Sequence, residues 1–467
     1  MLHRDIYQKL VEWKGKKGHH PLVLSGMRQT GKTFITKKFG EDNYKSVIFI
    51  DLRENKSIHE AFSQDFNVDK MVSRISANIH GNKFIEGNTL IILDEIQDCP
   101  NARSSLKYWD IDGRYDVIAT GSFLGIKGFR DNYKRGIPVG YEEHLIMHPL
   151  TFKEFVHNYK INPEVLAYVQ ECIDNVVPID QSIHDSFRNL YFEYLIVGGL
   201  PEAVNTFFES HDINAVRSVQ KRILNSIKDD LGRYRDSKGE VKINEVLKLR
   251  AIACLKSLPS QLAREYKKFK LSEVDSKAHS DDKRDALDYL WDLGLVIKVH
   301  NIREISYPLE SAILINEYKA YYSDIGLLTS ELGKDSAERI LNGDLGAYKG
   351  AIAENMVAVG FHTKDNTLYY YRGRSGSPEI DFVSEIDGKE TLIECKAGDN
   401  KAASLKYVLN NPKKYGKHPA IKIKDTNIGI GEGFITYPIY YSAFLKEESP
   451  LIIEEHDLSN LTVPKKK

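Results

Sequence analysis

The chain has 467 residues, of which 42% are hydrophobic and 28% charged, so it is long enough for several globular domains and is neither collagen-like nor of low complexity. Its 65 lysine and arginine residues nearly balance its 66 aspartate and glutamate residues, giving a formal net charge of -1. This balance excludes a global positive field that would draw the whole protein onto nucleic acid or an anionic membrane. Any phosphate-binding site must therefore be local.

Cysteine spacing and the absence of long apolar runs indicate a cytoplasmic protein. The cysteines are far apart and form no CxxC pair, which predicts reduced thiols; they are Cys99, Cys172, Cys254 and Cys395. The first residues lack the apolar region of a signal peptide, and no apolar run approaches the roughly 18 residues needed to span a bilayer. We therefore expect no membrane partner, and we expect residues 451–467 to form a solvated tail.

Short apolar runs alternate with helical patterns in the first third of the chain. Residues 21–25, 46–52, 89–93 and 115–120 read as buried strands. Such alternation predicts a parallel sheet with flanking helices, which we place in a domain of residues 1–155.

The sequence GMRQTGKT at residues 26–33 matches the phosphate-binding pattern G-x-x-x-x-G-K-[ST] between a predicted strand and a predicted helix. Glycines let the backbone curl so that its N–H groups face the phosphates. Lys32 would neutralise the β- and γ-phosphates, and Thr33 would offer its hydroxyl to Mg²⁺. The predicted ATP-binding residues of this loop are Gly26, Gln29, Thr30, Gly31, Lys32 and Thr33.

The apolar run at residues 89–93 ends in Asp94 and Glu95, which is a Walker B pattern. Asp94 would hold the metal through water, and Glu95 would orient or deprotonate the attacking water, so that hydrolysis is feasible. A loop that binds ATP without turning it over is the alternative. Without the preceding loop, an acidic pair at this position would be read as a solvated strand end.

The next predicted strand ends in Thr120, Gly121 and Ser122. Either hydroxyl would lie near the γ-phosphate, at the sensor position of AAA+ proteins, although an ordinary turn with a helix N-cap is the alternative. Arg130 and Arg135 follow this strand and are candidates for an arginine finger, against the alternative of solvated surface arginines.

The remaining chain predicts three further regions. Residues 156–240 are helical by periodicity, and residues 241–335 combine helix, turn and strand in a pattern that resembles a winged helix, which could contact DNA or only pack. Residues 345–450 predict a compact α/β domain.

A hairpin in this last domain lets the strand register be calculated. Asp387-Gly388 is a strong two-residue turn, and if Ile386 pairs with Lys389, then Asp381 lies directly opposite Glu394. Opposed carboxylates repel each other unless a cation lies between them. Lys396 shares the face of Glu394 because side chains alternate along a strand.

This arrangement predicts a divalent-metal site. Asp381 and Glu394 would hold Mg²⁺ with the carbonyl of Cys395, Lys396 would orient water, and Glu354 on the preceding helix could complete the site. A solvent-facing hairpin of alternating charge is the alternative, and a longer turn would change the pairing.

These motifs, in this order, resemble the prokaryotic AAA+-like ATPases of the AAA_14 type that carry a C-terminal DUF4143 domain. The resemblance rests on the two nucleotide motifs and on residues 148–155 (HPLTFKEF), 197–204 (VGGLPEAV) and 323–328 (SDIGLL). Residues 350–354, 380–382 and 393–396 look like a PD-(D/E)XK nuclease of the restriction-endonuclease-like fold. The resemblance implies nucleotide roles for Lys32, Thr33, Asp94 and Glu95, and nuclease positions for Glu354, Asp381, Glu394 and Lys396.

One departure from the family pattern concerns an arginine that many relatives place after a glycine, where this chain has Tyr141 after Gly140. The leading hypothesis is an ATPase that binds ATP and Mg²⁺ and governs a metal-dependent nuclease-like domain acting on DNA. The alternative is an ATP-driven switch or regulatory protein whose C-terminal domain is an inactive platform for an unknown protein partner. A homo-oligomer is expected if a neighbouring copy supplies the missing arginine.

Overall fold

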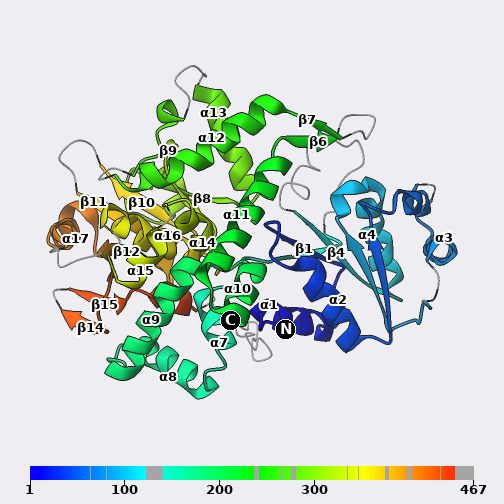
Figure 1. Ribbon diagram of the computed structural model, residues 1–467, viewed down its shortest axis with the longest axis horizontal. Helices are drawn as coiled ribbons and strands as arrows, with labels where there is room; N and C mark the ends of the chain where they lie inside the picture. Colours follow the sequence, from blue (N-terminus) through cyan, green and yellow to red (C-terminus); the bar gives the residue numbers. More distant parts are fainter. Residues whose placement is uncertain are drawn as a thin grey trace, which may run out of the picture.

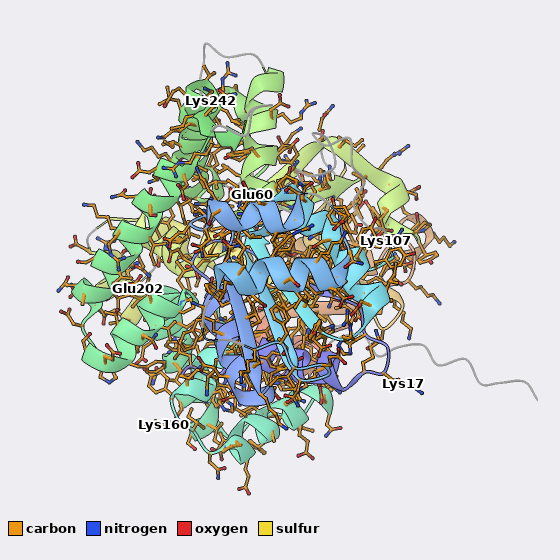
Figure 2. All side chains as sticks on the ribbon, turned by 90° about the vertical axis from the view of Figure 1, so that its right-hand side faces the viewer. Lys17, Glu60, Lys107, Lys160, Glu202 and Lys242 are labelled. Atoms are coloured by element: carbon orange, nitrogen blue, oxygen red, sulfur yellow. The ribbon has the colours of Figure 1, made fainter. Side chains whose placement is uncertain are left out.

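The computed structural model describes residues 1–63, 65–79, 81, 83–122, 140–235, 241–264, 267–274, 280–333, 335–344, 346–373, 378–396, 402–431 and 433–446. Figure 1 shows an N-terminal α/β unit at the right and a C-terminal sheet at the left, with a helical layer between them. Figure 2 views the molecule from the side of the N-terminal unit, which Glu202 of the helical layer and Lys242 flank. Among the described residues, no helix is both long and apolar enough to cross a membrane.

Parallel strands form the N-terminal sheet, in the order β2-β3-β4-β1-β5. The predicted strands are confirmed as β1 (Leu22–Gly26), β2 (Ser46–Asp51), β3 (Thr89–Asp94) and β4 (Asp116–Ser122). The fifth strand, β5 (Glu143–Ile146), escaped prediction because it is a short, half-exposed edge strand with no apolar run. Parallel strands bring their carboxyl ends to one edge, so the chain segments after β1, β3 and β4 meet there.

Helices cover both faces of this sheet. Residues of α1 (Asp5–Gly15) and α2 (Lys32–Asn43) pack on one face, around Leu24 and Ile92. Residues of α3 (Val68–Asn78) and α4 (Pro100–Asp112) pack on the other, together with the 3₁₀ helix η1 (Lys56–Phe62). A 3₁₀ turn, η2 (Ile96–Asp98), follows β3.

The helical layer confirms the helical periodicity predicted for the middle of the chain. Its helices are α7 (Phe152–Asn158), α8 (Pro163–Asp174), α9 (Gln181–Val197), α10 (Pro201–Ser210) and α11 (Ile213–Asp230). A short hairpin of β6 (Arg233–Arg235) and β7 (Val241–Ile243) follows α11.

The C-terminal sheet has the strand order β14-β15-β13-β12-β11-β10-β8-β9. Its strands are β8 (Val296–Ile302), β9 (Ile313–Tyr322), β10 (Tyr369–Arg372), β11 (Glu379–Ile386), β12 (Lys389–Lys396), β13 (Ala420–Lys424), β14 (Gly429–Gly431) and β15 (Phe434–Pro438). The associated helices are α12 (Glu245–Leu262), α13 (Ser280–Asp292), α14 (Ile325–Ser330), α15 (Ser336–Leu341), α16 (Lys349–His362), α17 (Ala403–Leu409) and α18 (Pro412–Tyr415), with the 3₁₀ turns η3 (Leu271–Glu273), η4 (Leu309–Ala312), η5 (Gly346–Tyr348) and η6 (Tyr441–Phe444).

One sheet crosses the boundary that we expected between residues 335 and 345. The sequence α12, α13 and the β8–β9 hairpin matches the winged-helix-like pattern locally, but β8 pairs in parallel with β10 of the C-terminal region. The hairpin therefore extends the C-terminal sheet instead of standing beside it. The core is shared too, since one hydrophobic cluster runs from Phe152 in the helical layer through Tyr321 to Ile421.

Candidate functional site

The phosphate-binding loop joins β1 to α2 in a conformation that its residue types explain. Gln29 and Gly31 have positive φ values of 67° and 92°. A Cβ at Gly26 would lie 2.3 Å from the carbonyl oxygen of Met147, so only glycine fits there. The buried Thr30 hydroxyl donates to the Met27 carbonyl at 2.9 Å and fixes the loop from inside.

Lys32 lies at the start of α2 with its ammonium group turned into the loop. It donates to the carbonyl oxygens of Gly26 at 3.0 Å and Met27 at 2.9 Å. Burial lowers the pKa of Lys32 to about 8, although the nearby carboxylates of Glu95 and Asp94 oppose this shift. A half-buried cation at the start of a helix that follows a curled glycine loop is suited to bind an anion.

Thr33 and Asp94 bring together the oxygen ligands that Mg²⁺ requires. The Thr33 hydroxyl donates to both carboxylate oxygens of Asp94, at 3.1 and 2.9 Å, and the hydroxyl of buried Thr120 also donates to Asp94. Hard oxygen donors of this kind fit a Mg²⁺ ion held with nucleotide phosphates. Thr120 therefore contacts the predicted metal ligand Asp94, and Ser122 lines the neighbouring cavity, which Thr120 does not line.

Glu95 follows β3 in a left-handed conformation, with a φ of 54°. Its Oε2 accepts hydrogen bonds from Arg53 at 3.1 Å and from Gln97. Arg53 follows β2 and also donates to Asp98 at 3.2 Å, so it fixes the direction of the carboxylate. Arg53 was not among the residues predicted from the sequence, where its one signal is its position just after the strand next to β3.

These residues line a cavity of about 470 Å³ at the carboxyl edge of the sheet. Its volume lies in the usual range of small-molecule sites. The helical layer closes one side, because the end of α11 contributes Ser226, Ile227 and Asp230. Lining residues from the N-terminal unit are Arg28, Gln29, Gly31, Lys32, Thr33, Phe34, Arg53, Asp94, Glu95 and Ser122.

The arginine-finger candidates Arg130 and Arg135 lie outside the described residues. Two other arginines, Arg28 and Arg53, line the cavity itself. Periodicity gave no reason to select either, because each contact depends on a partner from another element.

The register calculated for the C-terminal hairpin is confirmed. Pairs from Phe382 with Ile393 to Ile386 with Lys389 follow the calculated register, and Asp387 and Gly388 have the positive φ values of 49° and 67° that a two-residue turn needs. The paired residues end at Phe382 and Ile393, and extending this register by one residue along both strands brings Asp381 opposite Glu394. The Asp381 carboxylate accepts from the Cys395 N–H at 2.8 Å.

Glu394 is buried beside Asp381, and Lys396 contacts its Oε1 at 2.5 Å. Its other oxygen, Oε2, has no hydrogen-bond partner among the described residues. Burial, together with the neighbouring charge of Asp381, raises the pKa of Glu394 to about 8, and burial also raises the pKa of Asp381. An unpartnered buried carboxylate oxygen opposite a second acid is the kind of donor set that fits a cation.

Glu354 of α16 lies near these acids but is already neutralised by lysines. Lys267 forms an ion pair with its Oε1, Lys319 lies 3.6 Å from its Oε2, and the Tyr321 hydroxyl donates to it at 2.9 Å. Burial works to raise the pKa of Glu354, but the two lysines outweigh it and lower the pKa to about 2. Within the described residues, no group of three or more acidic, histidine or cysteine side chains is arranged to hold a metal. The site offers two carboxylates rather than three.

The P-loop is bound to the segment at residues 148–155 by a buried arginine. Arg4 donates to the carbonyl oxygens of Thr30 at 3.1 Å and His148 at 2.6 Å, and its guanidinium pairs with Glu154 at 3.1 Å. Glu154 also completes a capping box with Thr151 at the start of α7. The loop therefore cannot move without disturbing this segment.

Hydrogen bonds also connect the segment at residues 148–155 to the other two segments that carry the family resemblance, residues 197–204 and 323–328. The Leu150 N–H donates to the Gly199 carbonyl at 2.7 Å, and the Gly199 N–H donates to Asp324 at 2.7 Å. Ser323 reaches the Met27 sulfur of the P-loop at 3.7 Å. All three distant segments thus meet beside the nucleotide loop.

Models of known protein families match the region that contains the phosphate-binding loop and the region that contains Asp381 and Glu394. Residues 18–156 match the AAA domain family AAA_14, residues 188–338 match the domain of unknown function DUF8612, and residues 349–441 match the domain of unknown function DUF4143. The chain carries an AAA domain and a DUF4143 domain. This part of the resemblance is confirmed, and the N-terminal sheet with its helices is that of a P-loop NTPase.

Solved structures show weaker similarity, and no curated protein matches the chain. The Walker-type ATPase PABY2304 of Pyrococcus abyssi is 14% identical over 71% of this chain and 96% of its own, with a TM-score of 0.44. The ORC2 protein of Aeropyrum pernix is 10% identical over 73% of this chain and 92% of its own, with a TM-score of 0.33. Cdc6p of Pyrobaculum aerophilum is 13% identical over 73% and 94%, with a TM-score of 0.23. The ATP site is therefore assigned from its own residues and from the AAA family match.

Proposed function

We propose that this protein is a Mg²⁺-dependent ATPase whose nucleotide site acts on the C-terminal domain through the helical layer. The observation that carries the proposal is the meeting of Lys32, Thr33, Asp94 and Glu95 around one cavity that α11 closes. Lys32 would bind the β- and γ-phosphates, and Thr33 and Asp94 would hold Mg²⁺, which draws charge from the phosphates. Glu95 would accept the proton of the attacking water.

The first test is Mg²⁺-dependent ATP hydrolysis by the wild type and by Lys32→Ala. Lys38→Ala is the matched control, because Lys38 lies on the same helix but pairs with Asp42 on the surface. We expect Lys32→Ala to lose ATP binding and turnover, while Lys38→Ala keeps both. Equal turnover by the wild type and Lys32→Ala would overturn the proposal.

A second candidate function is metal-dependent nuclease activity in the C-terminal domain. It is supported by the hairpin register, which brings Asp381 opposite Glu394 when extended by one residue, by the unpartnered Glu394 oxygen and by the adjacent ammonium of Lys396. Asp381 and Glu394 would hold the metal, and Lys396 would stabilise negative charge on a phosphodiester. The lysines bound to Glu354 favour the alternative, in which this domain is an inactive platform for a protein partner.

Cleavage assays separate these two readings. Single- and double-stranded DNA and RNA would be incubated with Mg²⁺ or Mn²⁺, with and without ATP, using the wild type, Asp381→Ala and Lys396→Ala. Lys389→Ala, at the exposed start of the same strand, is the control. A nuclease predicts cleavage that Asp381→Ala and Lys396→Ala abolish while ATP turnover survives. Intact substrates in every arm would exclude the nuclease and leave the ATP-driven switch.

Three partners are proposed for this protein: DNA, an unidentified protein and a second copy of the chain. DNA added to the ATPase assay tests the first of them. Stimulation of Lys32-dependent turnover would support a nucleic-acid-coupled enzyme, and it should weaken with salt, because contacts of lysine and arginine with phosphates release counterions.

A further inference from the structure

A carboxylate from the helical layer lies inside the phosphate-binding cavity. Asp230 ends α11 and lines the same cavity as Lys32 and Thr33. Arg28 of the P-loop forms an ion pair with its Oδ2, and Arg233 pairs with its Oδ1 at 2.8 Å. Arg28 is therefore bound to the helical layer, although it lies in the loop that faces the phosphates.

This placement is electrostatically opposed to a bound triphosphate. The carboxylate adds to the partial negative charge that the C-terminal end of α11 already carries. Like charges a few ångströms apart in a partly buried site repel by an amount on the order of a few kcal/mol. A nucleotide that enters the cavity must therefore compete with Asp230 for Arg28.

We propose that Arg28 is a phosphate-binding residue of the ATP site and that Asp230 holds it until the triphosphate displaces the carboxylate. This inference rests on the proposed ATP-binding function and adds its regulation. Arg28 supplies a second cation to the phosphates only after the end of α11 has released it.

Helix α11 connects Asp230 to the C-terminal half of the chain through side-chain contacts. Lys228, in the last turn of α11, pairs with Glu331 at 3.6 Å. Further back on the helix, the Gln220 amide donates to the carbonyl oxygens of Ile196 at 2.8 Å and Val197 at 2.9 Å. Movement of α11 would therefore be felt at Glu331 and at Val197, which begins the segment 197–204.

The proposal is tested by measuring the nucleotide affinity of variants in which one charged side chain is replaced by an uncharged one. Dissociation constants for Mg²⁺-ATP and Mg²⁺-ADP would be measured by calorimetry on the wild type, Asp230→Asn, Asp229→Asn and Arg28→Ala. Asp229 is the matched control, because it is an exposed carboxylate at the same helix end but lines an outer groove instead of the cavity.

We expect Asp230→Asn to bind ATP about tenfold more tightly and ADP with a smaller gain, because the γ-phosphate adds the charge that competes for Arg28. Arg28→Ala should weaken ATP binding by about tenfold, and Asp230→Asn should gain less in that background. Asp229→Asn should stay within about twofold of the wild type because its charge is exposed and screened.

The two proposals fail in different ways. If the wild type binds no Mg²⁺-ATP, or binds it independently of Lys32, the ATP site itself is wrong. If binding depends on Lys32 but Asp230→Asn has the wild-type affinity, the role of Asp230 is wrong. Amide hydrogen exchange gives a second readout: Mg²⁺-ATP should accelerate exchange at the end of α11 in the wild type, and unchanged exchange would also contradict the release.

Discussion

Glu95, the proposed base, is held by one residue that follows β2 and by one in the 3₁₀ turn η2. Its backbone is left-handed, with a φ of 54°, and Arg53 and Gln97 donate hydrogen bonds to its Oε2. Both restraints lower the cost of orienting the group when the substrate binds, which is how a positioned base gains its effect.

Replacing Glu95 with Gln should leave ATP binding intact and lower the rate of hydrolysis by about two to four orders of magnitude, which is the usual contribution of a positioned base. The variant keeps the shape and the hydrogen-bonding oxygen but cannot accept the proton. Single-turnover hydrolysis and nucleotide affinity would be measured side by side, with the exposed neighbour Glu54→Gln as control. Equal turnover by the wild type and Glu95→Gln would remove Glu95 from this role.

Asp324 is a buried carboxylate whose ionisation is opposed by its surroundings. It caps α14 and accepts from the N–H groups of Leu327 at 2.9 Å and Gly199 at 2.7 Å. Burial raises its pKa from 3.8 to about 6, although these N–H groups oppose the shift.

Because the pKa is higher in the folded protein, the stability that Asp324 contributes is fully present below about pH 4 and is lost as the pH rises through about 6. About two pKa units correspond to roughly 3 kcal/mol. Denaturation of the wild type and Asp324→Asn across this range should show the wild type losing stability relative to the variant as the pH rises. A constant difference between the two would contradict the raised pKa.

At the scale of the elements, close backbone contacts explain why the glycines of residues 197–204 and 323–328 are needed. A Cβ at Gly199 would lie 2.1 Å from the Leu150 carbonyl oxygen, and a Cβ at Gly326 would lie 2.7 Å from the Val197 carbonyl oxygen. These contacts involve backbone atoms, which cannot rotate away as a side chain would.

Gly199→Ala should therefore lower the free energy of unfolding by about 2 kcal/mol or more, as overpacking of a tight contact does. Gly429→Ala is the matched control, because nothing lies within 4 Å of a Cβ built there. Thermal or denaturant unfolding measures the difference. A Gly199→Ala variant as stable as Gly429→Ala would mean that the backbone contact is not as close as described.

At the scale of the whole molecule, the cores are divided unequally. The N-terminal sheet has its own clusters on both faces and the C-terminal sheet has one cluster of its own, whereas a further cluster is shared by the helical layer and the C-terminal sheet. A shared core makes the latter two regions unfold together.

Calorimetry should accordingly resolve at most two main transitions. Mg²⁺-ATP at about 100 times its dissociation constant should stabilise the N-terminal unit by roughly 2.7 kcal/mol, and Lys32→Ala should abolish this shift. Separate melting of the helical layer and the C-terminal sheet would contradict the shared core.

The sequence alone was enough to predict features that depend on residues close together in the chain. The order of strand, P-loop and helix follows from local pattern, and so does the acidic pair after β3. The register that places Asp381 beside Glu394 also followed, because a two-residue turn of Asp387 and Gly388 leaves only one pairing.

Only the tertiary structure decided which distant groups meet. It joined Asp230 to Arg28, placed Lys267 on Glu354, and paired β8 with β10, so that the expected winged-helix-like segment became part of the C-terminal sheet. The physical reason is that periodicity and turn chemistry act over a few residues, whereas these contacts depend on how whole elements pack. The sequence therefore determined the chemical groups of the predicted nucleotide site, and the packing of α11 determined that Asp230 lines the same cavity and pairs with Arg28.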